Sequence, residues 1–301
     1  MLLTTRRSYT GFLLTLLMLC SISASATNKP SPSGFEIPDS EVLQIQSKQL
    51  GRSYDIYIKL PPSYFDKGNQ LRKYPVVYLN DGLYSFQLAS GITHAAMINR
   101  AMEHHILVGI SYSPSDRPFE SRRRDFTPKT EDNPNGEAEQ YLGFLKQELF
   151  PLVENRYRIN SLRRAYAGYS LGGIFGLYAL FEHSDSFRYY LISSPSIWFS
   201  NRWVLKKELA VAKETMDINA ELFMGVGAFE RPAGSNDDYN KPTPINMVKD
   251  FGLLYDQLEQ RNYPSLRLNK QIVEQAHHEL TYPTVLTQGL YWLLPGEKYQ
   301  K

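Results

Sequence analysis

Short apolar segments alternate with helix-length segments along most of this chain, and this alternation constrains the fold more than any other feature. The apolar runs occupy residues 74–80, 105–112, 163–169, 187–194, 220–227 and 266–274. Helical segments are expected over residues 86–103, 136–157, 171–183, 202–214, 244–262 and 283–294. Strands that alternate with helices form parallel sheets with helices on both faces. The order therefore predicts an α/β protein with a mainly parallel sheet.

Two further segments predict an antiparallel hairpin at one edge of this sheet. Residues 42–50 and 54–61 alternate apolar and polar side chains on either side of a Gly-Arg-Ser turn at 51–53. Pro151 lies within the helical segment 136–157 and should kink or interrupt it. Only one helix separates residue 198 from the strand at 220, so no large lid is expected over the sheet.

The first residues have the pattern of a secretory signal peptide, which we place at residues 1–26. Arg6 and Arg7 precede an apolar run, and Ala24-Ser25-Ala26 has the form of a cleavage site. The run is shorter than the roughly 20 residues of a membrane span. We therefore expect export to the periplasm or the outside without stable membrane insertion. Residues 27–40 predict a linker, and residues 41–296 one α/β domain.

Composition excludes several kinds of chemistry. Cys20 is the only cysteine and lies within the predicted signal, so disulfides and thiol catalysis are not expected. The signal carries two of the 33 basic residues and no acidic one, so the remaining chain has no basic excess over its 31 acidic residues. This balance argues against a nucleic-acid partner.

A G-x-S-x-G sequence at residues 168–172 follows a predicted strand and opens a predicted helix. Such a turn presents its serine above the sheet edge, and the next backbone N–H lies at a helix N-terminus, where it can stabilise an oxyanion. The motif alone also fits a tightly packed turn without chemistry. Because strand and helix stand where the motif requires them, we interpret Ser170 as a nucleophile and the N–H of Leu171 as an oxyanion donor.

A nucleophilic serine needs a base and an orienting acid, which we expect after later strands in the order serine, acid, histidine. His277 and His278 follow the last strand, and either can serve as the base. Glu230 follows the strand at 220–227, with Asp237 and Asp238 as alternative acids. No neighbouring residues complete a zinc motif with the tandem histidines, so no metal is expected. No other cofactor is needed for this chemistry.

A second oxyanion donor should come from the loop after the strand at 74–80. This loop reads Asn-Asp-Gly-Leu, and Gly82 allows close approach of the backbone. We assign the N–H of Gly82 or Leu83 to this role. Asp81 fits equally well as a turn or helix-cap residue and is given no chemistry.

Several segments together resemble the "putative esterase" family of α/β-hydrolases, in particular its periplasmic branch of siderophore esterases of the enterobactin type. They are YPVVYLNDG, RRRDFTP at 122–128, the helical segment 136–158, the block from the G-x-S-x-G motif to SSPSIWF, and EQAHHELTYP. The resemblance spans residues 42–295. It implies an α/β-hydrolase fold and ester hydrolysis through an acyl-enzyme.

The resemblance also implies roles for individual residues. The family's E-x-x-H pattern falls on residues 274–277 and selects His277 over His278, although His278 and Glu279 stand where small residues are usual. Residues 229–232 look like the family's R-E-P segment, which implies Glu230 as the acid, while some relatives use a Ser-His pair alone. Arg124 is a candidate contact for a polyanionic or catecholate ligand, or else pairs with Asp125 on a solvated loop. Trp198 either lines the acyl pocket or packs beneath it.

We thus expect an exported serine esterase that acts on a small-molecule ester, with the ester bonds of a ferric siderophore as candidates. A general carboxylesterase shares every residue named here. A thioesterase similar to S-formylglutathione hydrolase fits the same residues, but that activity belongs in the cytoplasm. A binding protein without catalysis on a hydrolase scaffold predicts no covalent labelling of Ser170.

Overall fold

The computed structural model describes residues 34–232 and 245–299. The predicted signal and residues 27–33 of the predicted linker lie outside this part. The helices and strands of the described residues belong to the unit that begins at Glu36. Among the described residues, no helix has the length and apolar character needed to cross a membrane.

Eight strands form one sheet in the order β1-β2-β4-β3-β5-β6-β7-β8. Pairing of β2 with β1 and with β4 is antiparallel, and all other neighbours are parallel. This confirms the mainly parallel sheet with an antiparallel hairpin at one edge. The strands are β1 (Ser40–Gln46), β2 (Ser53–Lys59), β3 (Tyr74–Leu79), β4 (Ile106–Ile110), β5 (Ile159–Tyr169), β6 (Tyr189–Ser193), β7 (Glu221–Gly227) and β8 (Arg267–Val273).

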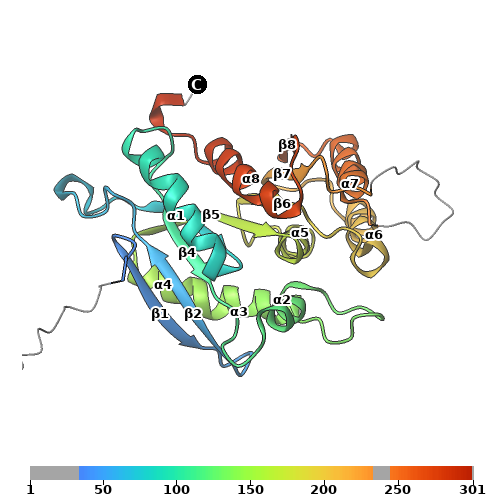
Figure 1. Ribbon diagram of the computed structural model, residues 1–301, viewed down its shortest axis with the longest axis horizontal. Coiled ribbons are helices and arrows are strands. Elements are labelled where there is room, and N and C mark those ends of the chain that lie inside the picture. Colours follow the sequence, from blue (N-terminus) through green and yellow to red (C-terminus); the bar gives the residue numbers. More distant parts are fainter. Residues whose placement is uncertain (1–33, 233–244, 300–301) are drawn as a thin grey trace, which may run out of the picture. The chain divides into compact units, whose positions relative to one another are not determined.

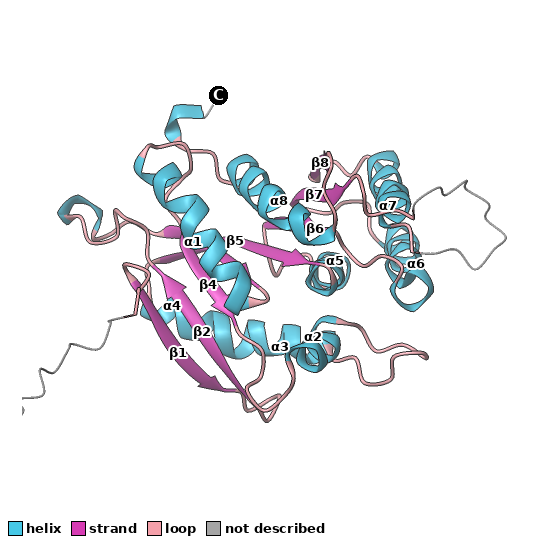
Figure 2. Ribbon diagram, viewed as in Figure 1, coloured by secondary structure: helices cyan, strands magenta, loops and turns pink. Residues whose placement is uncertain are grey.

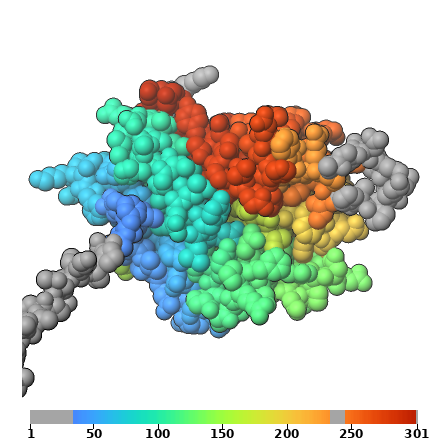
Figure 3. All heavy atoms as spheres, in the orientation of Figure 1, coloured from blue at the N-terminus to red at the C-terminus, as the bar shows by residue number. Residues whose placement is uncertain are grey.

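Helices cover both faces of the sheet (Figures 1 and 2). Two of them, α1 and α8, pack on one face and form one continuous surface in the space-filling view (Figure 3). The other face carries α2 to α7 and the larger apolar core. The helices are α1 (Gly82–Ile98), α2 (Pro118–Phe126), α3 (Ala138–Phe144), α4 (Phe150–Arg156), α5 (Leu171–Glu182), α6 (Phe199–Glu214), α7 (Met247–Arg261) and α8 (His278–Leu293).

Strand alternation divides the core between the two faces. In β3, Val76 and Tyr78 point into the larger core, whereas Val77 and Leu79 point toward α1 and α8. All four side chains are fully buried. A central strand with apolar residues on both faces is what a sheet covered on both sides requires, and this explains the continuous apolar runs in the sequence.

The expected helix at 136–157 consists of three pieces. A π-helical segment, Leu145–Leu149, separates α3 from α4, and Pro151 is the second residue of α4. Proline has no N–H to donate and its ring clashes with the carbonyl four residues earlier, so the α-helical pattern cannot continue through this position. The predicted interruption is confirmed.

Arg124 and Asp125, for which a solvated loop was one interpretation, lie instead in the helix α2. Pro118 occupies the first turn, where its missing N–H costs nothing. Asp125 is buried and accepts from Tyr54 Oη and Arg52 Nη2, each at 2.8 Å. The expected pairing of Arg124 with Asp125 is present at 2.9 Å. These buried polar contacts hold the helix in place, and a search for apolar periodicity does not detect them.

Candidate active site

The turn at residues 168–172 joins β5 to α5 and brings Ser170 to the carboxyl edge of the sheet. Ser170 has φ 59° and ψ −114°, a strained backbone conformation for a residue with a side chain, costing about 1–3 kcal/mol. A Cβ on Gly168 would collide with the carbonyl oxygen of Gly172. The sharp turn that lifts the serine therefore requires glycine at position 168.

Hydrogen bonds from β6 and the loop after it hold this turn in its strained form. The N–H of Ser170 donates to the carbonyl of Ser193 at 3.0 Å, and the N–H of Ser196 donates to the carbonyl of Ser170 at 3.2 Å. The Ser196 hydroxyl lies 3.3 Å from that of Ser170. Ser196 is buried. It lies outside the G-x-S-x-G motif, and no sequence pattern assigned it a role.

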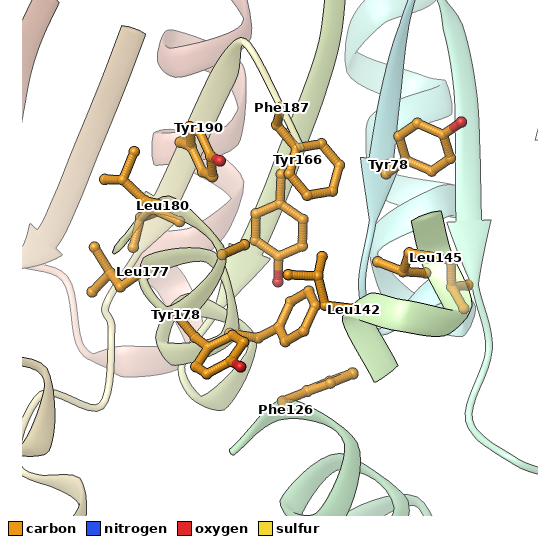
Figure 4. Packing of buried hydrophobic residues seen from close by; sticks show 14 of the residues in the cluster. Tyr78, Phe126, Leu142, Leu145, Tyr166, Leu177, Tyr178, Leu180, Phe187 and Tyr190 are labelled. Atoms are coloured by element: carbon orange, nitrogen blue, oxygen red, sulfur yellow. The ribbon is translucent and has the colours of Figure 1, made fainter. Parts of the chain in front are cut away.

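Tyr166 supports the turn from below. Its ring lies in the larger core, near Phe187 and Leu142 (Figure 4). Its hydroxyl donates to the carbonyl of Gly172 at 2.5 Å and accepts from Asn80 Nδ2 at 2.8 Å. Tyr166 thus connects the first turn of α5 with the loop that follows β3.

The loop after β3 contains the predicted second oxyanion donor. The N–H groups of Gly82, Leu83 and Leu171 lie in the first turns of α1 and α5 and have no hydrogen-bond acceptor among the described residues. A Cβ on Gly82 would lie 2.7–2.8 Å from backbone atoms of Ile110, so only glycine fits there. First-turn N–H groups are the donors that an oxyanion needs.

Asp81 precedes these donors and is a buried structural residue, with φ 56°. Its carboxylate accepts from Arg122 at 2.6 and 3.1 Å and from the Tyr112 hydroxyl at 2.9 Å. Arg122 Nη2 also donates to the carbonyl of Tyr169 at 3.4 Å. The Asp81–Arg122 pair therefore ties the loop after β3 to the residue that precedes the nucleophile.

Glu230 follows β7 and is buried, with 8 % of its surface exposed. Its Oε1 accepts from the Ser194 hydroxyl at 2.6 Å, from the Gly227 N–H at 2.7 Å and from the Thr281 hydroxyl at 2.8 Å. Burial alone would raise the pKa of this carboxyl, but the hydrogen bonds from His278, Ser194, Gly227 and Thr281 lower it below its ordinary value. Glu230 is therefore held as a carboxylate.

The partner of this carboxylate is His278. Its Nδ1 lies 2.5 Å from Glu230 Oε2, and its ring centroid lies 4.6 Å from that of Tyr169, the neighbour of Ser170, with the two rings tilted by 35°. His277 is exposed, and its ring lies 5.1 Å from that of Phe229. The expected pairing of Glu230 with His277 is thus not the one in the structure.

The physical reason is the position of the two histidines at the start of α8. His277 is the N-cap residue, with extended backbone, and His278 is the first helical residue, so the two side chains point in different directions. Which of the two rings reaches Glu230 thus depends on the residue at which α8 begins. No hydrogen bond joins His278 to Ser170 among the described residues, and such contacts are often long in unliganded hydrolases.

The remaining candidates lie at the same edge or outside the described residues. Trp198 is the N-cap residue of α6 and is 39 % exposed. Arg124 donates from Nη1 to Asp116 at 2.8 Å and from Nε to Asp125 at 2.9 Å, so its guanidinium group is already paired with two carboxylates. Asp237 and Asp238 lie outside the described residues. No group of His, Cys, Asp and Glu suited to a metal ion is found in residues 34–232 and 245–299.

The chain re-enters the described part close to the acid. The N–H of Met247, the first residue of α7, donates to the carbonyl of Glu230 at 3.0 Å. The N–H of Glu230 donates to the carbonyl of Gly227, also at 3.0 Å. The backbone of Glu230 is thus fixed from both sides.

Comparison with known proteins identifies relatives for this arrangement. The chain is 32 % identical over 200 residues to the ferri-bacillibactin esterase BesA of Bacillus subtilis, a match that covers 60 % of this chain and 66 % of the relative. It is 31 % identical over 216 residues to the siderophore triacetylfusarinine C esterase of Aspergillus fumigatus, covering 68 % and 72 %.

Among solved structures, the BES protein of Bacillus cereus superposes with a TM-score of 0.73 at 27 % identity. The superposition covers 88 % of this chain and 98 % of that protein. These similarities show the α/β-hydrolase fold that the sheet order also indicates. The model of the "Putative esterase" family matches residues 47–263, and the chain therefore belongs to that family.

Proposed function

We propose that this protein is a serine esterase that hydrolyses the ester bonds of siderophores. The observation that carries the proposal is the pairing of the buried Glu230 with the half-buried His278, together with a serine on a strained turn. Membership of the esterase family supports ester hydrolysis, and the names of the two curated relatives support siderophores as the substrate class.

In the proposed reaction, Ser170 Oγ attacks the ester carbonyl and its proton passes to Nε2 of His278. Glu230 accepts from Nδ1, so Nε2 is left without a proton and can act as the base. The N–H of Leu171 and that of Gly82 or Leu83 stabilise the oxyanion. The imidazolium then protonates the leaving alcohol. Water hydrolyses the acyl-enzyme by the same steps in reverse.

This assignment places His278, and not His277, in the role of the base. Alanine variants of the two neighbours separate the alternatives. We expect His278→Ala to lower kcat by roughly 10²–10⁴-fold, the usual contribution of a general base. His277→Ala should remain within a few-fold of wild type. Equal losses, or a larger loss in His277→Ala, would refute the assignment.

Active-site labelling tests the nucleophile. A fluorophosphonate should label the wild-type protein once, at Ser170, and should not label Ser170→Ala. A binding protein without catalysis would remain unlabelled. Mass spectrometry of a ferric siderophore triester after incubation with the protein, beside short p-nitrophenyl esters, tests the substrate class. A strong preference for the short esters would favour a general carboxylesterase.

We further propose that the protein is exported. The two arginines, the apolar run and the Ala-Ser-Ala site within residues 1–26 support this. Expression of the full chain in a bacterium, followed by fractionation and intact-mass measurement, checks the proposal. We expect a mature protein that begins after Ala26. An uncleaved cytoplasmic product would contradict it.

A further inference from the structure

Exposed apolar side chains follow the strands at the carboxyl edge of the sheet, the edge at which Ser170 lies. Every parallel strand except β5, which is followed directly by Ser170, is followed by at least one of them. We call this set the apolar collar: Leu83 and Tyr84 after β3, Phe119 after β4, Trp198 after β6, Phe229 after β7 and Leu280 after β8. Their exposed fractions range from 39 % for Trp198 to 63 % for Phe119 and Leu280.

The strand order places the collar on both sides of the nucleophile. β3 and β4 lie on one side of β5, and β6, β7 and β8 lie on the other. The carboxyl ends of parallel strands meet at one edge of a sheet, where ligands bind in folds of this class. A substrate centred on Ser170 would therefore meet collar residues in both directions, on its acyl side and on its alcohol side.

Ring contacts connect the collar with the catalytic histidine. Tyr84 lies 5.8 Å from Tyr282, Tyr282 lies 5.3 Å from Tyr169, and Tyr169 lies 4.6 Å from His278, measured between ring centroids. The burial of Tyr282 and its hydrogen bond to Ser85 fix the middle of this row. A continuous row of aromatic rings thus joins one collar residue, Tyr84, to His278.

The arginines of α2 do not offer a site for a polyanion. Arg122 is bound to Asp81, and Arg124 is bound to Asp116 and Asp125. Arg123 is exposed and donates to the Asn133 side chain. Two of the three charges are therefore neutralised by carboxylates. An anionic ligand at Arg122 or Arg124 would have to break these pairs.

We infer that the apolar collar binds bulky uncharged groups on both sides of the scissile ester, so that substrate affinity comes from apolar contact and not from charge. This inference rests on the proposed esterase function. Exposed apolar side chains gathered at one edge of a fold are typical of a binding surface. The free energy gained when apolar surface is removed from water is proportional to the area that is covered. Affinity should therefore grow with the size of the groups that the collar covers.

A series of p-nitrophenyl esters from acetate to octanoate tests the inference. In wild type we expect kcat/KM to rise at least about tenfold along the series, because each CH₂ buried adds to affinity. Phe119→Ala and Leu280→Ala should lower kcat/KM for the octanoate roughly three- to tenfold, mainly through KM. The ratio of kcat/KM for the octanoate to kcat/KM for the acetate should therefore fall in both variants, because the acetate is too short to cover the collar.

Phe65→Ala is the matched control. Phe65 is 70 % exposed and follows β2, whose antiparallel direction places its carboxyl end at the opposite edge of the sheet. This variant should resemble wild type on every ester. Salt gives a second readout: kcat/KM for the octanoate should not fall between low ionic strength and about 0.5 M NaCl, because apolar contact is not screened.

The outcomes separate the two proposals. The collar would be overturned, and the esterase left intact, if the acetate is hydrolysed but kcat/KM does not increase with acyl chain length. Collar variants that behave like Phe65→Ala, or a kcat/KM for the octanoate that falls with salt, would have the same meaning. Absence of both acetate turnover and fluorophosphonate labelling would overturn the esterase, and with it the collar.

Discussion

Replacement of Glu230 by glutamine tests the central claim about the site. The side chain keeps its size but loses one acceptor. Three donors converge on Oε1, namely Ser194 Oγ, Gly227 N and Thr281 Oγ1, so the amide oxygen must take that place. The amide NH₂ then faces Nδ1 of His278, 2.5 Å from the former Oε2.

The consequence is a change of tautomer. An NH₂ group can only donate, so Nδ1 must accept and the ring proton moves to Nε2, the nitrogen assigned to receive the proton of Ser170. The equivalent change in serine proteases lowers kcat by about 10⁴ without altering the geometry. We expect a loss of roughly 10³–10⁴-fold in kcat for Glu230→Gln, or about 4–5.5 kcal/mol in the activation free energy. KM should stay within a few-fold.

Steady-state kinetics on a short ester measure this loss. Glu208→Gln is the control, because Glu208 is likewise a buried glutamate. It is bound to Arg261 and lies on α6, away from the strand ends. This variant should lower the melting temperature and leave kcat unchanged. If Glu230→Gln loses less than about tenfold while remaining folded, the Ser-His pair works alone and the reasoning fails.

Two further predictions concern the oxyanion loop and acid stability. Gly82→Ala should lower kcat by roughly 10–10³-fold, because its Cβ meets the backbone of Ile110 at 2.7 Å and must displace the donors. Gly91→Ala on the same helix, where a Cβ meets nothing within 4 Å, should retain activity and be more stable by about 0.5–1 kcal/mol; equal activities would refute the role of the loop. The hydrogen bonds of Glu230 lower its pKa in the folded state, so its ionisation stabilises the fold at neutral pH, and this contribution is lost as pH falls below its ordinary value of 4.5 toward the folded pKa. Thermal unfolding between about pH 7 and 3 should therefore show wild type losing stability relative to Glu230→Gln as pH falls, and a constant difference would contradict this.

The sheet could be predicted almost completely from the sequence, because the parallel strands are short, largely apolar runs and the two hairpin strands alternate apolar and polar residues around a turn. All eight expected strands are present, with ends shifted by up to four residues. The helix α2 could not be predicted, because the buried contacts of Asp125 hold it and its own apolar pattern does not. Polar contacts between residues 71 positions apart leave no local pattern.

The candidate site shows the same division. The strand–turn–helix context indicated the turn at Ser170 and the position of Glu230 after β7. The choice between His277 and His278 depended on where α8 begins, and helix ends are the least predictable part of a sequence. The signal that could have helped is the threonine at position 281. It lies one helical turn after His277 and bonds both that residue's carbonyl and Glu230.

The hydrogen bond between Met247 and Glu230 has a consequence for the start of α7. The Met247 N–H donates to the Glu230 carbonyl, and the Glu230 N–H donates to the Gly227 carbonyl, so the end of β7, the acid and the first residue of α7 are joined through their backbones. A substitution that unwinds the first turn of α7 would therefore also loosen the acid, although it touches no group of the proposed reaction.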